Sequence, residues 1–170
     1  MLETYLNALE TGYYEVTFAF EGLADENVWN RPAPGLLSVG ELAAHIAFGE
    51  ATHFTAEGNG EGRPDLTTCK VQIVLIDPRF AYYPHTLELA PSDEHLAMTA
   101  EQVCQELVRV HKESVEYLKA LNPDLNSVAP GWPEWHTYLE FVKYMIFHVA
   151  YHTGQMYSVR HLLGDTTPDN

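Results

Sequence analysis

Two histidines four residues apart, His148 and His152, form the segment HVAYH near the C-terminus. On a helix, residues at this spacing share a face, with β-carbons about 5–6 Å apart. The spacing alone is a weak signal, because pairs of solvated surface histidines are common. Here Phe141, Met145 and Val159 continue the same face, which predicts that both imidazoles point into the core. Burying such a ring without a partner costs about 1–3 kcal/mol, so something must satisfy the pair.

His45 is the best candidate for a third partner, because it follows Leu42 on the inward face of another predicted helix. A lone histidine there would more often bond a backbone carbonyl or a tyrosine. Three converging imidazoles, however, form a divalent-metal site with an open position for water or substrate, as in catalytic zinc sites. We expect zinc first, although nickel, iron, copper or manganese fit the same ligands. Gln155 would either bond a ligand from behind or pack through its aliphatic part.

The remaining histidines are expected to be ordinary surface or structural residues. His53, two turns beyond His45, would line the mouth of the site or, as we prefer, face solvent. The others have no partner at ligand spacing: His85, His95, His111, His136 and His161.

Several common catalytic motifs are missing from the sequence. Val149 follows His148 where an HExxH metalloprotease carries its glutamate, which disfavours that class. The chain also lacks a G-x-S-x-G elbow, a phosphate-binding glycine loop and the paired E-x-x-H motifs of di-iron bundles. Glu50 is the one carboxylate that we consider as a base near the histidines.

Four segments repeat apolar residues at three- and four-residue spacing, which predicts four helices. They span residues 2–23, 38–54, 99–121 and 141–162. Capping boxes open the second at Ser38 with Glu41 and the third at Thr99 with Gln102. The pair Asn122-Pro123 should end the third helix, and Gly164 should follow the fourth. The pattern is typical of an all-α four-helix bundle, and we expect one domain over residues 1–170.

The connections between these helices are unequal in length. Residues 57–98 form a long crossover between the second and third helices, containing VQIVLI at 71–76 as either a short strand or an extended strap. A connection this long usually covers a site or an interface. Its apolar residues would cover the pocket or form a homodimer interface: Val71, Ile73, Leu75, Phe80, Tyr82 and Tyr83. Trp29 and the segment 121–135 should pack over the ends of the bundle.

Composition narrows the classes of partner. The formal charge is −15, from 24 acidic and 9 basic residues, which argues against binding nucleic acid or anionic membranes. No apolar run approaches the ~18–20 residues of a membrane span, and the N-terminus does not resemble a signal peptide. Cys69 and Cys104 fit no metal-finger spacing. We therefore expect a cytoplasmic protein with two free thiols.

The combined motifs resemble the DinB-like (DinB/YfiT) superfamily. The resemblance covers nearly the whole chain and rests on SVGELAAHIAFGE around His45 and on HVAYHTGQMYSVRHLLG from His148. His45, His148 and His152 match the metal positions of the family, while Thr153 stands where arginine is frequent. The resemblance implies a four-helix bundle, often dimeric, with a divalent metal on three histidines. It also implies possible activity as a thiol S-transferase or isomerase that uses a low-molecular-weight thiol.

These observations leave several functions open. The leading hypothesis is a metal-dependent thiol S-transferase acting on a small molecule, with Tyr144 or Tyr151 as a candidate proton donor. A metal-dependent hydrolase that activates water is the alternative enzyme. A non-catalytic metal-binding stress-response bundle is a third reading, followed by a metal-free bundle with hydrogen-bonded core histidines.

Overall fold

The fold is described by a computed structural model, which covers residues 1–76 and 90–168. Its four long helices are α1 (Leu2–Phe20), α3 (Val39–Thr55), α5 (Ala100–Leu121) and α6 (Tyr138–Leu162), and its short helices are α2 (Asp25–Val28), η1 (Leu66–Thr68) and α4 (Asp93–Leu96). Within the described ranges the chain forms two isolated β-bridges and no strand. The prediction of an all-α protein is therefore confirmed.

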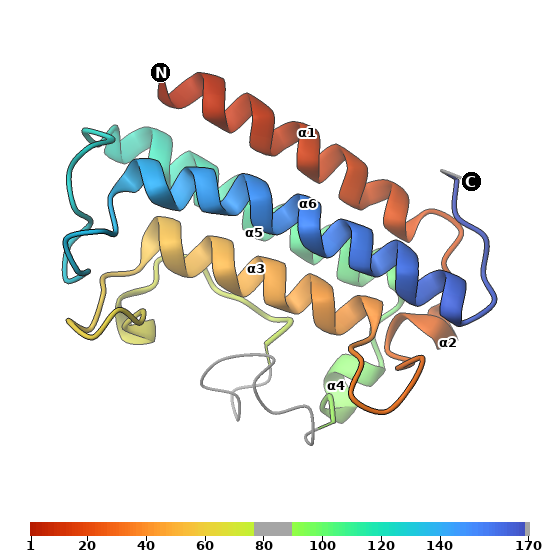
Figure 1. The fold of residues 1–170 in the computed structure, drawn as a ribbon. Coiled ribbons are helices and arrows are strands. Elements are labelled where there is room, and N and C mark those ends of the chain that lie inside the picture. The colour runs from red at the N-terminus through yellow and green to blue at the C-terminus, as the bar shows by residue number, and fades with distance from the viewer. Residues whose placement is uncertain (77–89, 169–170) are drawn as a thin grey trace.

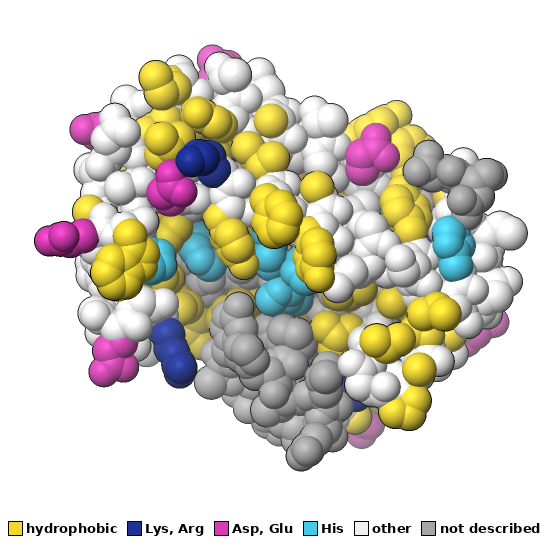
Figure 2. Space-filling model, viewed as in Figure 1, with side chains coloured by type: hydrophobic (Ala, Val, Ile, Leu, Met, Phe, Trp, Pro, Cys, Tyr) yellow, Lys and Arg dark blue, Asp and Glu magenta, His cyan; other side chains and the backbone are white. Residues whose placement is uncertain are grey.

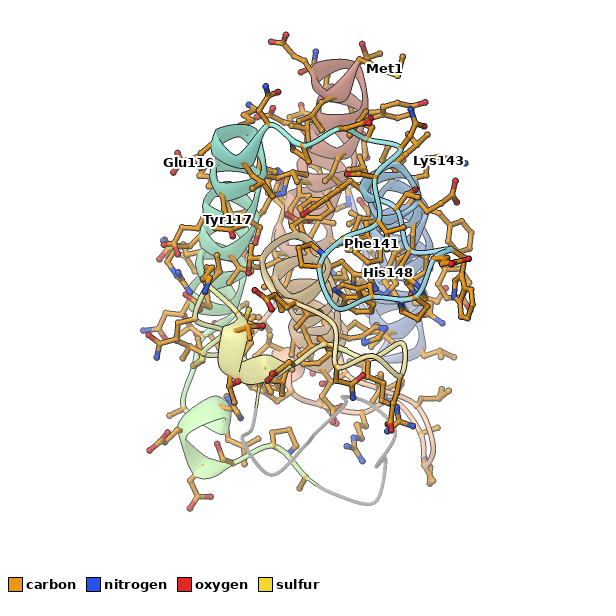
Figure 3. All side chains as sticks on the ribbon, turned by 90° about the vertical axis from the view of Figure 1, so that its left-hand side faces the viewer. Met1, Glu116, Tyr117, Phe141, Lys143 and His148 are labelled. Atoms are coloured by element: carbon orange, nitrogen blue, oxygen red, sulfur yellow. The ribbon has the colours of Figure 1, made fainter. Side chains whose placement is uncertain are left out.

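The long helices lie side by side, with α5 and α6 on opposite sides of the molecule (Figures 1 and 3). Each of these two helices contacts both α1 and α3. Fully buried aliphatic side chains from all four helices meet between them, among them Leu9, Ile46, Leu107 and Met145. Among the described residues, no helix is both apolar enough and long enough to cross a bilayer.

The predicted helix ends are largely those observed. Ser38 with Glu41 and Thr99 with Gln102 both form complete capping boxes. Asn122 ends α5 in the left-handed conformation, with φ 43° and ψ 55°. This short polar side chain tolerates that conformation better than most residues.

The first helix ends earlier than its apolar pattern predicts. It stops at Phe20, because Gly22 turns the chain at φ +70°, and Leu23 is buried from the turn that follows. The guanidinium of Arg160 on α6, 1% exposed, donates hydrogen bonds to the carbonyls of Ala19 and Glu21. A buried cation therefore satisfies the free carbonyls at the end of α1.

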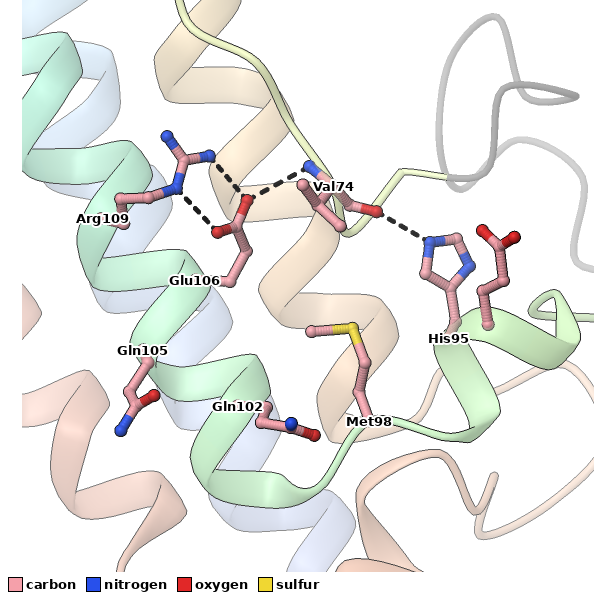
Figure 4. A pocket seen from close by; sticks show the side chains of 8 residues that line it. Val74, His95, Met98, Gln102, Gln105, Glu106 and Arg109 are labelled. Atoms are coloured by element: carbon pink, nitrogen blue, oxygen red, sulfur yellow. Dashed lines mark hydrogen bonds and ion pairs between the residues drawn. The ribbon is translucent and has the colours of Figure 1, made fainter.

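The part of the connection between α3 and α5 that precedes residue 77 forms no strand at 71–76, where residues 74 and 75 make a turn. Val71 and Leu75 are buried in the core of this same chain. The imidazole Nε2 of His95 lies 2.9 Å from the carbonyl oxygen of Val74, and a carboxylate oxygen of Glu106 accepts from the Val74 amide at 3.2 Å (Figure 4). Phe80, Tyr82, Tyr83 and His85 lie outside the described residues.

The connection between α5 and α6 is the ordered cap that we predicted. The Trp132 indole is 7% exposed and donates to the Ala56 carbonyl at 3.3 Å. Gly58 and Gly131 touch back to back, since a β-carbon on either would lie within 2.4 Å of the other's carbonyl oxygen. At the other end, Trp29 is 9% exposed and packs on Gly40 at the start of α3.

Candidate metal centre

The three histidines singled out by their spacing meet between α3 and α6. His45 is 7% exposed, His148 4% and His152 9%. The Nε2 atoms of His45 and His148 are 3.0 Å apart, and one ring nitrogen from each of the three residues lies within 4.8 Å of the others. The ring of His45 meets those of His148 and His152 edge to face, with centroids 4.7 and 4.5 Å apart.

Gly49 allows the two helices to approach closely enough for this convergence. It lies one turn after His45 on α3, and its face is covered by the His148 ring. A β-carbon at position 49 would lie 3.0 Å from Cε1 and 3.5 Å from Nδ1 of His148. Because such contacts are tighter than ordinary van der Waals packing, a glycine is what leaves space for the imidazole.

Gln155 sets the orientation of one histidine of the cluster, His152. Its Oε1 accepts from Nδ1 of His152 at 2.6 Å, and its amide nitrogen donates to the Tyr151 hydroxyl at 3.3 Å. With the proton on Nδ1, Nε2 of His152 carries the lone pair that binds a metal. The role of Gln155 behind a ligand, one of two alternatives from the sequence, is thus the observed one. A hydrogen bond of this kind holds the ring orientation of metal-binding histidines.

The electrostatics of the site keep the imidazoles of His148 and His152 neutral. Burial, followed by the charges of His45 and His152, lowers the pKa of His148 from 6.5 to about 2. Burial also lowers the pKa of His152, against the opposing effect of its bond to Gln155. These two rings therefore carry free lone pairs at neutral pH, which is the form that a metal ion requires.

The donor set fits a divalent ion. Two nitrogens that bind one zinc ion tetrahedrally at 2.0–2.1 Å lie about 3.3 Å apart, close to the 3.0 Å between His45 and His148. Nδ1 of His148 is buried with no hydrogen-bond partner among the described residues, so this ring is held by packing against Gly49 and Tyr144. Three imidazole nitrogens, with no fourth ligand among residues 1–76 and 90–168, match an open, catalytic type of site.

Two tyrosines of α6 pack beside the three-histidine cluster. Tyr144 lies beside His148 and Tyr151 beside His152, with ring centroids 5.1 and 5.0 Å apart, and both tyrosines are partly exposed. Figure 2 shows histidine side chains on the face formed by α3 and α6, with hydrophobic side chains on both sides. Both candidate proton donors therefore stand next to the site.

His53 differs from the solvent-exposed residue that we preferred from the sequence. It is half-buried between Trp132, Phe141 and Tyr144. Its Nδ1 lies 2.6 Å from the Gly49 carbonyl oxygen. Burial lowers its pKa to about 4, although the bond to that carbonyl acts in the opposite direction. His53 is therefore a packed, neutral ring among the aromatic residues next to the three-histidine cluster.

Glu50 does not face the three histidines, so it is not the carboxylate base that we considered. Its side chain is fully buried and points towards α5, where Oε1 lies 2.7 Å from Nδ1 of His111. The His111 ring is 7% exposed and stacks on Tyr13 of α1 at 3.7 Å. Burial, with a further contribution from Glu50, raises the pKa of Tyr13. Sequence reasoning missed this buried cluster, although the spacing carried a signal: His111 lies four residues after Leu107 and three before Ser114, on the buried face of α5.

Comparison with models of protein families identifies the superfamily to which this chain belongs. The family model for the DinB superfamily matches residues 8–156, so the chain belongs to the DinB superfamily. Neither the comparison with curated proteins nor that with solved structures gives a match. The match includes His45, His148, His152 and Gln155, and the recognition made from the motifs is confirmed.

Proposed function

We propose that this protein is a metalloenzyme in which His45, His148 and His152 hold one divalent ion, with zinc as the first choice and nickel, iron or manganese as alternatives. The observation that carries the proposal is the convergence of three buried imidazoles, with one ring nitrogen of each within 4.8 Å of the others. The four long helices that position them support a four-helix bundle of the DinB/YfiT type.

The proposed reaction is transfer of a low-molecular-weight thiol to a small electrophile. An ion at the site would supply Lewis acidity, which lowers the pKa of a thiol that reaches it. Gln155 keeps Nε2 of His152 directed at the site. His148 and His152, whose pKa values are lowered by burial, would bind the ion as neutral imidazoles. Tyr144 packs beside His148 and Tyr151 beside His152. The hydroxyl of either tyrosine is a candidate to return a proton to the product.

A hydrolase remains the second candidate, because the same site would activate water. What weighs against it is the absence of a carboxylate from the three-residue cluster and the engagement of Glu50 with His111. A purely structural metal is the non-catalytic alternative. Structural zinc closes its fourth position with a protein ligand, and the described residues offer three.

Elemental analysis tests the metal. The parent protein, purified without a nickel column, should contain about one ion per chain, and His148→Ala should contain none. His161→Ala, which changes an exposed histidine on the same helix, is the matched control and should keep the ion. A parent that stays empty after incubation with zinc, nickel, iron and manganese would overturn the proposal.

Turnover then separates the two reactions. Metal-loaded protein is mixed with monobromobimane or a chlorodinitroarene and several thiols, and in parallel with esters and amides without thiol. Metal-dependent conjugation that is lost in His148→Ala supports the transferase. Ester or amide cleavage without conjugation supports the hydrolase. If the metal-loaded protein shows neither activity, the ion is structural.

We also propose a cytoplasmic location and a homodimer. Free Cys69 and Cys104 are consistent with a reducing compartment. Exposed Tyr144, Phe147 and Tyr151 on α6 offer apolar surface to a second copy. Sedimentation equilibrium measures the assembly state directly.

A further inference from the structure

A second feature of the α3–α6 interface is a cavity of about 410 Å³ one helical turn away from the histidines. Its walls come from the segment before α3, from α3 and from the last turns of α6: Leu36, Leu37, Leu42, Gln155, Val159 and Leu162. Leu42 precedes His45 by three residues, a rise of about 4.5 Å along the helix. The cavity has the size of a small-molecule pocket.

The cavity shares a wall with the metal centre. Gln155 lines the cavity and also holds Nδ1 of His152 at 2.6 Å. The side chain of Gln155 therefore contacts both the cavity and the histidine cluster. A molecule bound at the histidines would lie next to the cavity along α6. Leu36 and Leu162, 42% and 64% exposed, stand at the open side.

The polar groups of this cavity are already engaged within the protein. Gln155 uses its carbonyl oxygen for His152 and its amide for the Tyr151 hydroxyl. The Ser158 hydroxyl donates to the carbonyl of Gly154 at 2.9 Å. The other lining side chains are aliphatic, and a glycine completes the wall. A polar ligand group would have to break these bonds, whereas a hydrocarbon group gains about 25 cal/mol per Å² of buried apolar area without breaking any.

From these contacts we infer that the cavity binds the hydrocarbon part of a substrate whose reacting group lies at the three histidines. This inference rests on the proposed function and extends it, because it assigns the substrate class: a small molecule with an alkyl or similar apolar arm next to the reacting atom. Polar electrophiles without such an arm should bind less tightly.

The first test uses metal-free protein, so that it is independent of the ion. 1-Hexanol is titrated into protein with labelled methyl groups, and 1,6-hexanediol serves as the polar control. Hexanol should shift the NMR signals of Leu42, Val159 and Leu162, while the diol should shift them far less. Equal effects of both alcohols, or no effect on these methyls, would overturn the inference.

The second test joins the cavity to the metal. Straight-chain hydroxamates from acetohydroxamate to octanohydroxamate are titrated into metal-loaded protein by calorimetry. Affinity should rise up to about fourfold for each added methylene until the cavity is filled. Ser158→Phe places a ring at the cavity wall and should remove this rise, while acetohydroxamate binding and metal content stay unchanged. Lys143→Phe, at an exposed position of α6 that does not line the cavity, should behave like the parent.

The outcomes separate the two proposals. A parent without metal shows that the proposed function fails, and the hexanol titration still reports on the cavity. Full metal content with the same affinity for every hydroxamate, or a rise that persists in Ser158→Phe, overturns the inference and leaves the metal centre standing.

Discussion

Gly49 of α3 and His148 of α6 are in direct contact, and the absence of a side chain at position 49 leaves space for the imidazole. A β-carbon there would lie 3.0 Å from Cε1. The histidine cluster thus depends on a residue without a side chain, because Gly49 sets how closely α3 and α6 approach.

Gly49→Ala should therefore weaken metal binding while the protein stays folded. The added methyl displaces the His148 ring by a few tenths of an ångström, and we expect a loss of about tenfold in affinity, the lower end of what is typical for misdirected ligands. Competition with a chelator of known affinity measures the loss. Gly154→Ala is the matched control, since a β-carbon there meets no atom within 4 Å. It should leave affinity unchanged and raise stability by about 0.5–1 kcal/mol. Parent-like affinity in Gly49→Ala would show that the contact does not limit the site.

The hydrogen bond from His152 to Gln155 gives a second prediction. Gln155→Leu removes the acceptor that fixes the tautomer of His152, so metal affinity should fall about 10- to 100-fold. Gln155→Glu keeps an acceptor oxygen at the same reach and should retain most of the affinity. Gln105→Leu, on the exposed side of α5, is the control for a general effect of losing an amide. If Gln155→Leu and Gln155→Glu lose affinity equally, the bond does not orient the ligand.

Local patterns made the helices and the three-histidine cluster predictable. The capping boxes at Ser38 and Thr99 depend on residues three apart, and the facing of His148 and His152 depends on residues four apart. Such relationships are contained in the chain before it folds. His45 could be paired with them because it lies on the inward face of its own helix.

Relationships between distant segments were not predictable in the same way. Leu23 continues the apolar spacing of α1, but it reaches the core only after the turn at Gly22. His111 lies on the buried face of α5, four residues after Leu107, but its contacts with Glu50 and Tyr13 depend on how three helices are rotated about their axes. Spacing within a helix does not fix that rotation, so this buried cluster is visible only in three dimensions.

The hydrogen bond between Glu50 and His111 should stabilise the fold without affecting metal content. Glu50→Gln leaves the shape of the core but removes the carboxylate that accepts from His111, and we expect a loss of about 1–3 kcal/mol in the free energy of unfolding. Urea denaturation measures this loss, and elemental analysis should find the parent metal content. A double-mutant cycle with His111→Phe should show coupling of about 0.5–3 kcal/mol. Unchanged stability with lost metal or turnover would place Glu50 in the reaction instead.

The lowered pKa values of the buried histidines predict how stability depends on pH. In the folded, metal-free protein the pKa of His148 is about 2 and that of His53 about 4, both below the ordinary value of 6.5. Below pH 6.5 the unfolded chain therefore binds more protons than the folded one, and stability falls as the pH falls. Above pH 6.5 these residues are neutral in both states and the full stability is present.

Urea denaturation of metal-free protein at pH 7.5, 6.5 and 5.5 should show this decline. His148 alone should contribute about 1.4 kcal/mol to the loss at pH 5.5, because its unfolded form is mostly protonated there. His148→Leu removes that proton-binding group and should lose correspondingly less stability over the same range. His161→Leu, at an exposed position of α6, is the control and should follow the parent. Equal slopes in the parent and in His148→Leu would mean that the His148 imidazole accepts a proton in the folded state as readily as in the unfolded chain.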